Sequence, residues 1–198
     1  QGKGGGGGGA EGFFDVRSRF EDTAYWTAHL RTGEDGQETV TVTLPDNLTT
    51  WRMDARAITG GTLVGQTHGD IVATKPLLVR PNTPRFFVAS DEATLSAAVN
   101  NNTDQDLDVK VRLEANGASI VGSAEQSVRV PAHGRAEVSW PVVVDSRAEW
   151  VDLTFSAVGG DLSDASKPTL GDPDHGQQIP VLNYSVPDSV GTAGQLTE

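Results

Sequence analysis

The chain has 198 residues, of which 36% are hydrophobic, and a formal net charge of −12. This length can bury one large core or two small ones, each of about 100 residues if they are β-sandwiches. No cluster of Lys and Arg interrupts the acidic balance, so the surface that nucleic acid or an anionic membrane requires is missing. No apolar run of about 18 residues occurs, so this segment is not expected to insert into a membrane.

Cysteine is absent, so disulfides contribute nothing to stability, and this fits a cytoplasmic protein and a bacterial exported one equally well. The chain starts with Gln1, and its only methionine is Met53. We therefore expect it to be a piece of a longer precursor.

The first twelve residues, QGKGGGGGGAEG, contain six consecutive glycines and predict a flexible coil. A phosphate-binding loop is excluded because no strand precedes the glycines and no Gly-Lys-Ser/Thr follows them. The segment is either a linker or an extended stretch open to proteases.

Alternating apolar and polar residues predict β-strands along most of the chain. The first predicted strand covers 39–44, and after the turn PDNLTT the second places Trp51, Met53, Ala55 and Ala57 on one face. We expect that face to be buried, with Trp51 filling the end of a sandwich core.

The same period recurs in 107–113, 135–140 and 151–157, and a last strand is expected in 179–186. With turn-rich connections between the runs, this predicts an all-β protein of two antiparallel β-sandwich domains. The residues between 159 and 178 are polar and predict a long loop.

Three prolines mark a change in the chain between the two halves. Pro76, Pro81 and Pro84 follow a strand predicted to end near Thr74. Prolines at this density favour an edge strand or a crossing between domains, so we place a domain boundary near Lys75.

The sequence contains no pattern that assigns a catalytic residue, a metal ligand or a cofactor. The four histidines are too far apart for a zinc site, and no G-x-S-x-G motif occurs. Two clusters of acidic residues are candidate cation ligands, but neither has the glycine and distal glutamate of a calcium loop, so solvated side chains are favoured. They are Asp172, Asp174 and His175, and Asp104, Asp106 and Asp108.

Three blocks in register resemble the alpha-2-macroglobulin family, in particular its bacterial branch: VRSRFEDTAYW (16–26), LPDNLTTWRMDARA (44–57) and KPLLVRPNTPRFFVASDEATLSAAVNNNT (75–103). The resemblance implies four segments. Residues 1–12 would be the end of the protease bait, 13–74 the later part of the sixth macroglobulin sandwich and hence an incomplete domain. Residues 75–184 would be the complete seventh macroglobulin sandwich, and 185–198 the start of a CUB-like domain.

The same resemblance implies a structural fragment of a broad-spectrum endopeptidase inhibitor, which is not an enzyme and traps proteases after they cut the bait. Its partners would be target proteases and the remaining macroglobulin, CUB and thioester domains of an extracytoplasmic parent. The family's thioester needs a cysteine, which this chain lacks. The bait candidates are Lys3, Glu11, Phe13 and Phe14, and the structural core signature is Trp26, Trp51, Phe86 and Phe87.

An immunoglobulin-like or fibronectin-like adhesion module is the alternative, because it has the same fold and needs no bait. Such a module would be favoured by rows of exposed aromatic residues. The tryptophans Trp26, Trp51 and Trp140 are dispersed and stand at strand positions expected to be buried, which favours the inhibitor fragment.

Overall fold

A computed structural model describes residues 15–184, and their regular structure is β-strand apart from one 3₁₀ turn, η1 (Pro173–His175). The all-β fold class is thus confirmed. The strands are β1 (Val16–Arg17), β2 (Thr50–Ile58), β3 (Val64–Val72), β4 (Leu77–Asn82), β5 (Phe87–Val88), β6 (Glu92–Asn101), β7 (Leu107–Asn116), β8 (Ala118–Ile120), β9 (Glu125–Val130), β10 (Arg135–Val144), β11 (Trp150–Gly159), β12 (Leu162–Ser166) and β13 (Ile179–Leu182).

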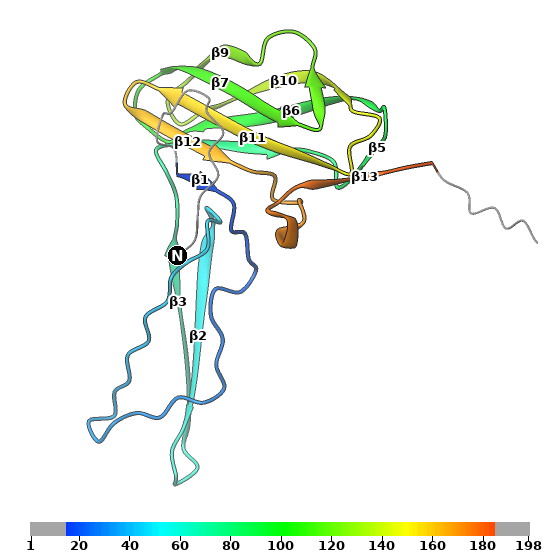
Figure 1. Cartoon of the computed structure of the whole chain (residues 1–198). Helices are drawn as coiled ribbons and strands as arrows, with labels where there is room; N and C mark the ends of the chain where they lie inside the picture. The colour runs from blue at the N-terminus through cyan, green and yellow to red at the C-terminus, as the bar shows by residue number, and fades with distance from the viewer. Residues whose placement is uncertain (1–14, 185–198) are drawn as a thin grey trace, which may run out of the picture.

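Two sheets form a β-sandwich that contains every strand except β2 and β3 (Figure 1). One sheet has four strands in the order β4-β6-β10-β8. In the other, β11 pairs with β7 on one side and with β12 and β13 on the other, while β9, β1 and β5 extend the sheet outward. The predicted strands 107–113, 135–140 and 151–157 lie within β7, β10 and β11.

The core lies between the two sheets and uses the alternation read from the sequence. Along β11 the inward residues are fully buried, while the residues between them are partly exposed. The rings of Trp140 and Phe155 meet edge to face at a centroid distance of 5.8 Å and an interplanar angle of 67°. Burial of these side chains between two layers supplies the main stabilisation of the sandwich.

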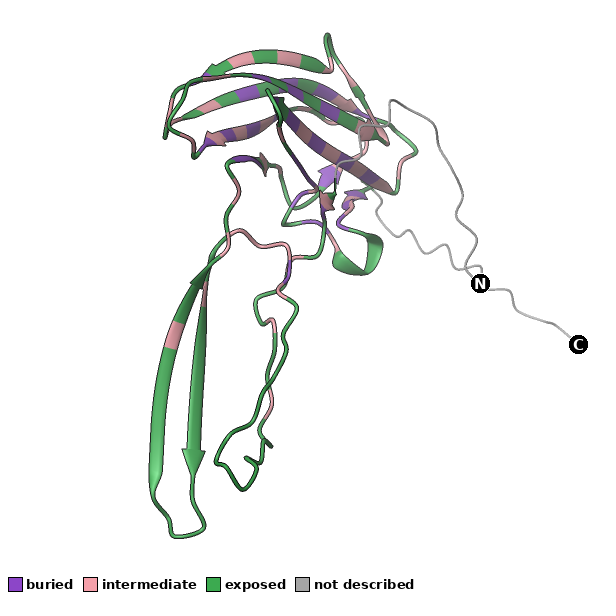
Figure 2. Ribbon diagram, turned by 90° about the vertical axis from the view of Figure 1, so that its left-hand side faces the viewer, coloured by how far each residue is buried: buried purple, intermediate pink, exposed green. Residues whose placement is uncertain are grey.

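Residues 18–74, which we call the arm, project away from one side of the sandwich (Figures 1 and 2). The arm contains the hairpin β2–β3, paired from Thr50 with Val72 to Ile58 with Val64, and the extended segment 18–49 beside it. Figure 2 shows that almost the whole arm is exposed. Pro45 is its one buried residue. The arm therefore has no hydrophobic core of its own within the described chain.

Two predictions for the arm are wrong in this chain. The run 39–44 forms no strand, and the face expected to be buried on β2 is open: Met53 is 52% exposed and Trp51 is half-buried. The physical reason is that no second layer of described residues covers the hairpin, so the alternating pattern has nothing to pack against.

The long loop predicted for 159–178 is also corrected, because it contains β12 and η1. The prolines were expected in an edge strand or at a crossing between domains, and one of them lies in an edge strand. Pro81 lies in β4, which is the edge strand of the four-stranded sheet, where a missing N–H is tolerated. The last strand, β13, is shorter than expected and ends at Leu182.

Candidate functional site

The first described residues are held against the sandwich by a very short parallel strand. In β1, Val16 pairs with Ala165 and Arg17 with Ser166, and the N–H of Lys167 donates to the carbonyl of Arg17 at 2.9 Å. Two residues of pairing are little in themselves. The attachment therefore depends on the Arg17 side chain.

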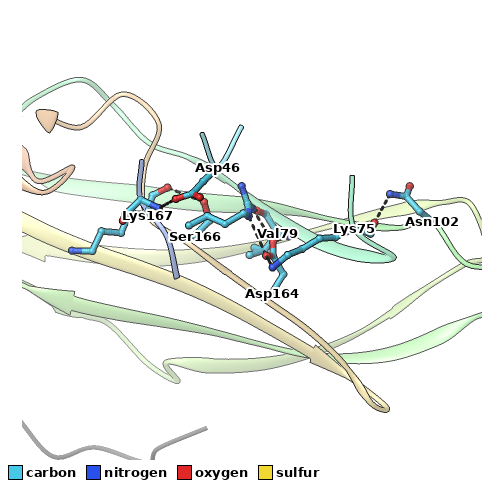
Figure 3. A network of polar contacts seen from close by, with 9 residues as sticks. Asp46, Lys75, Val79, Asn102, Asp164, Ser166 and Lys167 are labelled. Atoms are coloured by element: carbon cyan, nitrogen blue, oxygen red, sulfur yellow. Dashed lines mark hydrogen bonds and ion pairs between the residues drawn. The ribbon is translucent and has the colours of Figure 1, made fainter. Parts of the chain in front are cut away.

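That side chain enters a buried ion pair with Asp164 of β12. Arg17 Nε and Nη2 donate to the two carboxylate oxygens at 3.0 and 2.7 Å. Lys75 Nζ donates to the same carboxylate at 2.8 Å, and the backbone N–H of Val79 donates to it at 3.0 Å. Figure 3 shows Lys75 and Val79 converging on Asp164. We call these four residues the Asp164 junction.

The junction satisfies backbone groups that an edge strand leaves unpaired. Val79 lies in the edge strand β4, and its N–H donates to Asp164 while its carbonyl accepts a bond of 2.7 Å from Arg17 Nη2. An ion pair thus takes the place of a neighbouring strand. Because Asp164 belongs to one sheet and Val79 to the other, the junction also closes the sandwich between β12 and β4.

The electrostatics of the junction favour the charged carboxylate. Burial raises the pKa of Asp164, but the hydrogen bonds from Arg17, Lys75 and Val79 outweigh burial and hold the pKa below the ordinary 3.8. The Asp164 side chain is 0% exposed and that of Arg17 is 10% exposed. Removing one partner from such a pair leaves an uncompensated buried charge, which is strongly destabilising.

A second set of contacts stiffens the base of the arm. Asp46 accepts bonds from the N–H groups of Ser18 (3.0 Å) and Arg19 (2.8 Å), and its own N–H donates to the Arg19 carbonyl at 2.8 Å. Asn47 accepts from the N–H of Glu21 at 3.0 Å. The turn residues read from the sequence therefore fasten the middle of the arm to its beginning.

The structure does not gather the site residues predicted from the sequence. Of the four residues of the core signature, Phe87 is buried, Trp51 is half-buried, and Trp26 and Phe86 are 78% and 53% exposed. Trp26 and Phe86 are therefore not core residues of the described chain. The bait candidates Lys3, Glu11, Phe13 and Phe14 and the segment 185–198 lie outside the described residues.

Several of the side chains considered as cation ligands contact other residues of the chain. Asp172 accepts from the N–H of Asp174 and lies 3.2 Å from Nδ1 of His175, whose ring stacks on Trp150. Asp104 contacts His133. In residues 15–184, no group of three or more acidic, His or Cys side chains is arranged to hold a metal ion.

Sequence reasoning missed Arg17 and Asp164 and treated Lys75 only as a boundary. Nothing in the sequence pairs residues 17 and 164, because they are far apart in the chain. The composition of LSDAS (162–166) gives no local signal for the strand that holds Asp164, because Ser and Asp are typical of turns and Asp is depleted in strands.

Comparison with known proteins gives consistent results. A family model described as the alpha-2-macroglobulin family matches residues 23–113. An alpha-2-macroglobulin from Thermotoga maritima is 32% identical over 153 residues, which are 76% of this chain and 10% of the relative. One from Ralstonia nicotianae is 36% identical over 104 residues, covering 50% of this chain and 7% of the relative. The chain thus spans a tenth or less of these relatives.

The fold agrees with a solved structure of Escherichia coli alpha-2-macroglobulin activated by porcine elastase. That structure has a TM-score of 0.59 and 20% identity and covers 77% of this chain and 15% of its own. In residues 15–184, no helix is long and apolar enough to cross a membrane. The family model spans most of the arm and the first strands of the sandwich, and the Thermotoga relative extends the similarity over most of the chain, so this chain belongs to the alpha-2-macroglobulin family.

Proposed function

We propose that this chain is a scaffold fragment of a broad-spectrum endopeptidase inhibitor, which traps a protease after the protease has cut a bait region that ends with residues 1–12. The observation that carries the proposal is the position of Arg17. It follows the bait candidates by only a few residues, and a buried ion pair fastens it to the sandwich.

This placement suits a bait because it separates a cleavable stretch from a fixed one. A protease needs several extended residues to fill its cleft, and a glycine-rich stretch can adopt that conformation without steric strain. Lys3, Glu11, Phe13 and Phe14 present basic, acidic and aromatic side chains to proteases of different specificity. The Asp164 junction ends the accessible stretch, so a cut leaves the rest of the scaffold attached.

The open arm supports the assignment of 13–74 to an incomplete macroglobulin sandwich. Most of the exposed large hydrophobic side chains of the described chain lie in the arm. The concentration of exposed apolar side chains in one segment without a core of its own favours an interaction surface there. We infer that strands preceding Gln1 in the parent cover it, that 75–184 is the next complete macroglobulin sandwich, and that 185–198 leads into a CUB-like domain.

In this proposal the chain carries no catalysis, and its partners are target proteases and the other domains of the parent. The parent would act outside the cytoplasm, where foreign proteases are met. The adhesion module is the competing function, but it assigns no role to the tail at 1–12 or to the open arm.

Limited digestion of the full-length parent tests the proposal. Trypsin, a Glu-specific protease and chymotrypsin are each expected to cut first within 1–14, and mass mapping locates the cuts. A matched variant, Lys3→Gln, should lose the first tryptic cut and keep the chymotryptic one. First cuts inside a sandwich strand such as β7, or a cut parent that retains no protease, would overturn the proposal.

A further inference from the structure

Both ends of the arm meet at one carboxylate. Arg17 immediately precedes the arm and Lys75 immediately follows it, and both side chains bind Asp164. Arg17 Nε and Lys75 Nζ share one oxygen, while Arg17 Nη2 and the N–H of Val79 share the other. The chain thus leaves the sandwich and returns to it at the same buried group.

We propose that Asp164 is a clamp that fixes the direction of the arm relative to the sandwich by holding the two ends of the arm together. A segment tethered at one end can pivot about that end, whereas a second tether removes much of this freedom. The bonds of Asp46 to Ser18 and Arg19 make the base of the arm a stiff unit, so the clamp acts on the arm as a whole.

The two tethers, Arg17 and Lys75, differ in strength, so loss of one should affect the arm more than loss of the other. Arg17 makes two bonds to the carboxylate and one to the Val79 carbonyl, and 10% of its side chain is exposed. Lys75 makes one bond to the carboxylate, and 34% of its side chain is exposed. Arg17 is therefore the main positioning residue, because bidentate, buried pairs are stronger than single, half-exposed ones.

This asymmetry makes the junction a conformational device. If Arg17 is withdrawn, the front of the arm is freed while Lys75 and the backbone still join the arm to β4. A fixed arm then becomes a hinged one, and the sandwich stays folded. The inference concerns this chain by itself and does not depend on whether the parent traps proteases.

Because the chain has no cysteine, two can be introduced without interference and labelled for a distance measurement. Gln66 of β3 and Glu137 of β10 are both exposed and suit spin labels, one on the arm and one on the sandwich. In the 198-residue chain, the labels should give one narrow distance distribution. Asp164→Asn, which keeps the shape and removes the charge, should broaden it at least twofold.

Substituting each tether separately tests whether Arg17 contributes more than Lys75 to fixing the arm. Arg17→Gln should broaden the distribution nearly as much as Asp164→Asn, and Lys75→Gln should broaden it less. The control is Arg129→Gln, which removes an exposed ion pair with Asp106 on the sandwich and should leave the distribution unchanged. Equal widths in the wild type and in Asp164→Asn would overturn the clamp.

Hydrogen exchange on the same samples separates loss of the clamp from loss of the fold. Loss of a partner of Asp164 lowers the stability of the sandwich and so accelerates exchange of β6 and β10 amides somewhat, but in Arg17→Gln and Lys75→Gln these amides should stay far better protected than those of β2 and β3. If the distance distribution broadens only in variants whose β6 and β10 amides have lost this protection, the junction only stabilises the sandwich, and the clamp is overturned. Failure of the bait digestion alone would leave this inference intact.

Discussion

The sandwich and the arm contain strands of similar length and pattern but bury them to opposite extents. In β11, Val151, Leu153, Phe155 and Ala157 are all 0% exposed. In β2 the corresponding alternate positions are open, and Met53 is 52% exposed. The two strands differ in whether a second layer faces them. Alternation of apolar and polar residues therefore indicates which face of a strand can be buried. Whether that face is buried depends on the presence of a second layer.

The largest expected difference between the two regions is in hydrogen exchange. Amides of β6, β7, β10 and β11 should open only by global unfolding, whereas the isolated hairpin β2–β3 should open locally, so their rates should differ on the order of a thousandfold or more. Exchange measured by mass spectrometry on the 198-residue chain checks this. Equal protection in both regions, with a monomer by light scattering, would mean that the arm is already a complete domain.

Matched tryptophan substitutions should give the next largest effect. Trp140 is 0% exposed, and its Nε1 donates to the Ala124 carbonyl at 3.1 Å, so Trp140→Ala should cost about 3–5 kcal/mol of unfolding free energy. Trp51→Ala should cost less than about 1 kcal/mol in this chain, because Trp51 is half-buried and its Nε1 has no partner among the described residues.

Urea denaturation of the two variants measures this difference. In the full-length parent, where we infer that further strands cover the arm, the cost of Trp51→Ala should rise towards that of Trp140→Ala. An unchanged, small cost in the parent would contradict the inferred cover.

How far the sequence predicts the structure depends on the range of the interactions. The strands β7, β10 and β11 follow from local alternation, and the edge position of β4 follows from Pro81, because both signals act within a few residues. The open arm could not be deduced from alternation, since burial also requires a second layer. The expected core role of Trp51 failed for this reason.

The Asp164 junction was unpredictable for a different reason. Arg17, Lys75 and Asp164 come from three distant segments, and charged residues with no local pattern are by default read as solvated. Only the three-dimensional structure shows that Asp164 lies beside Val79 of the edge strand β4. The bait candidates remain predictions from the family resemblance, because they lie outside the described residues.

Acid should weaken the sandwich through the junction. Burial raises the pKa of Asp164, but bonds from Arg17 and Lys75 lower it more, so the folded pKa lies below the unfolded value of about 3.8. The stability contributed by the charged carboxylate is then complete above about pH 3.8 and is lost as pH falls through the folded pKa. Unfolding free energy measured from pH 6 to pH 2 should therefore fall more steeply below pH 4 in the wild type than in Asp164→Asn.

The matched control for the acid series is Asp106, an exposed carboxylate on the sandwich. Its pKa is also lowered, first by the N–H of Ala132 and then by Arg129. Asp106→Asn should change the pH dependence of the unfolding free energy less than Asp164→Asn does, because solvent screens an exposed pair. Equal changes in the two variants would mean that burial of Asp164 between the sheets has no special effect.

The smallest effect on stability should come from removing the ion pair that joins the two strands of the hairpin. Arg52 Nε lies 3.1 Å from Asp70 Oδ1, and the two residues face each other across β2 and β3, but their side chains are 64% and 44% exposed. Asp70 raises the pKa of Arg52 mainly through their hydrogen bond. Arg52→Gln should leave the unfolding of the sandwich unchanged and speed exchange of hairpin amides only about twofold, because an exposed cross-strand pair adds little. A faster-unfolding sandwich would show that the arm and the sandwich are coupled more strongly than the open geometry of the arm implies, and a tenfold change in the hairpin would show that this exposed pair contributes more than expected.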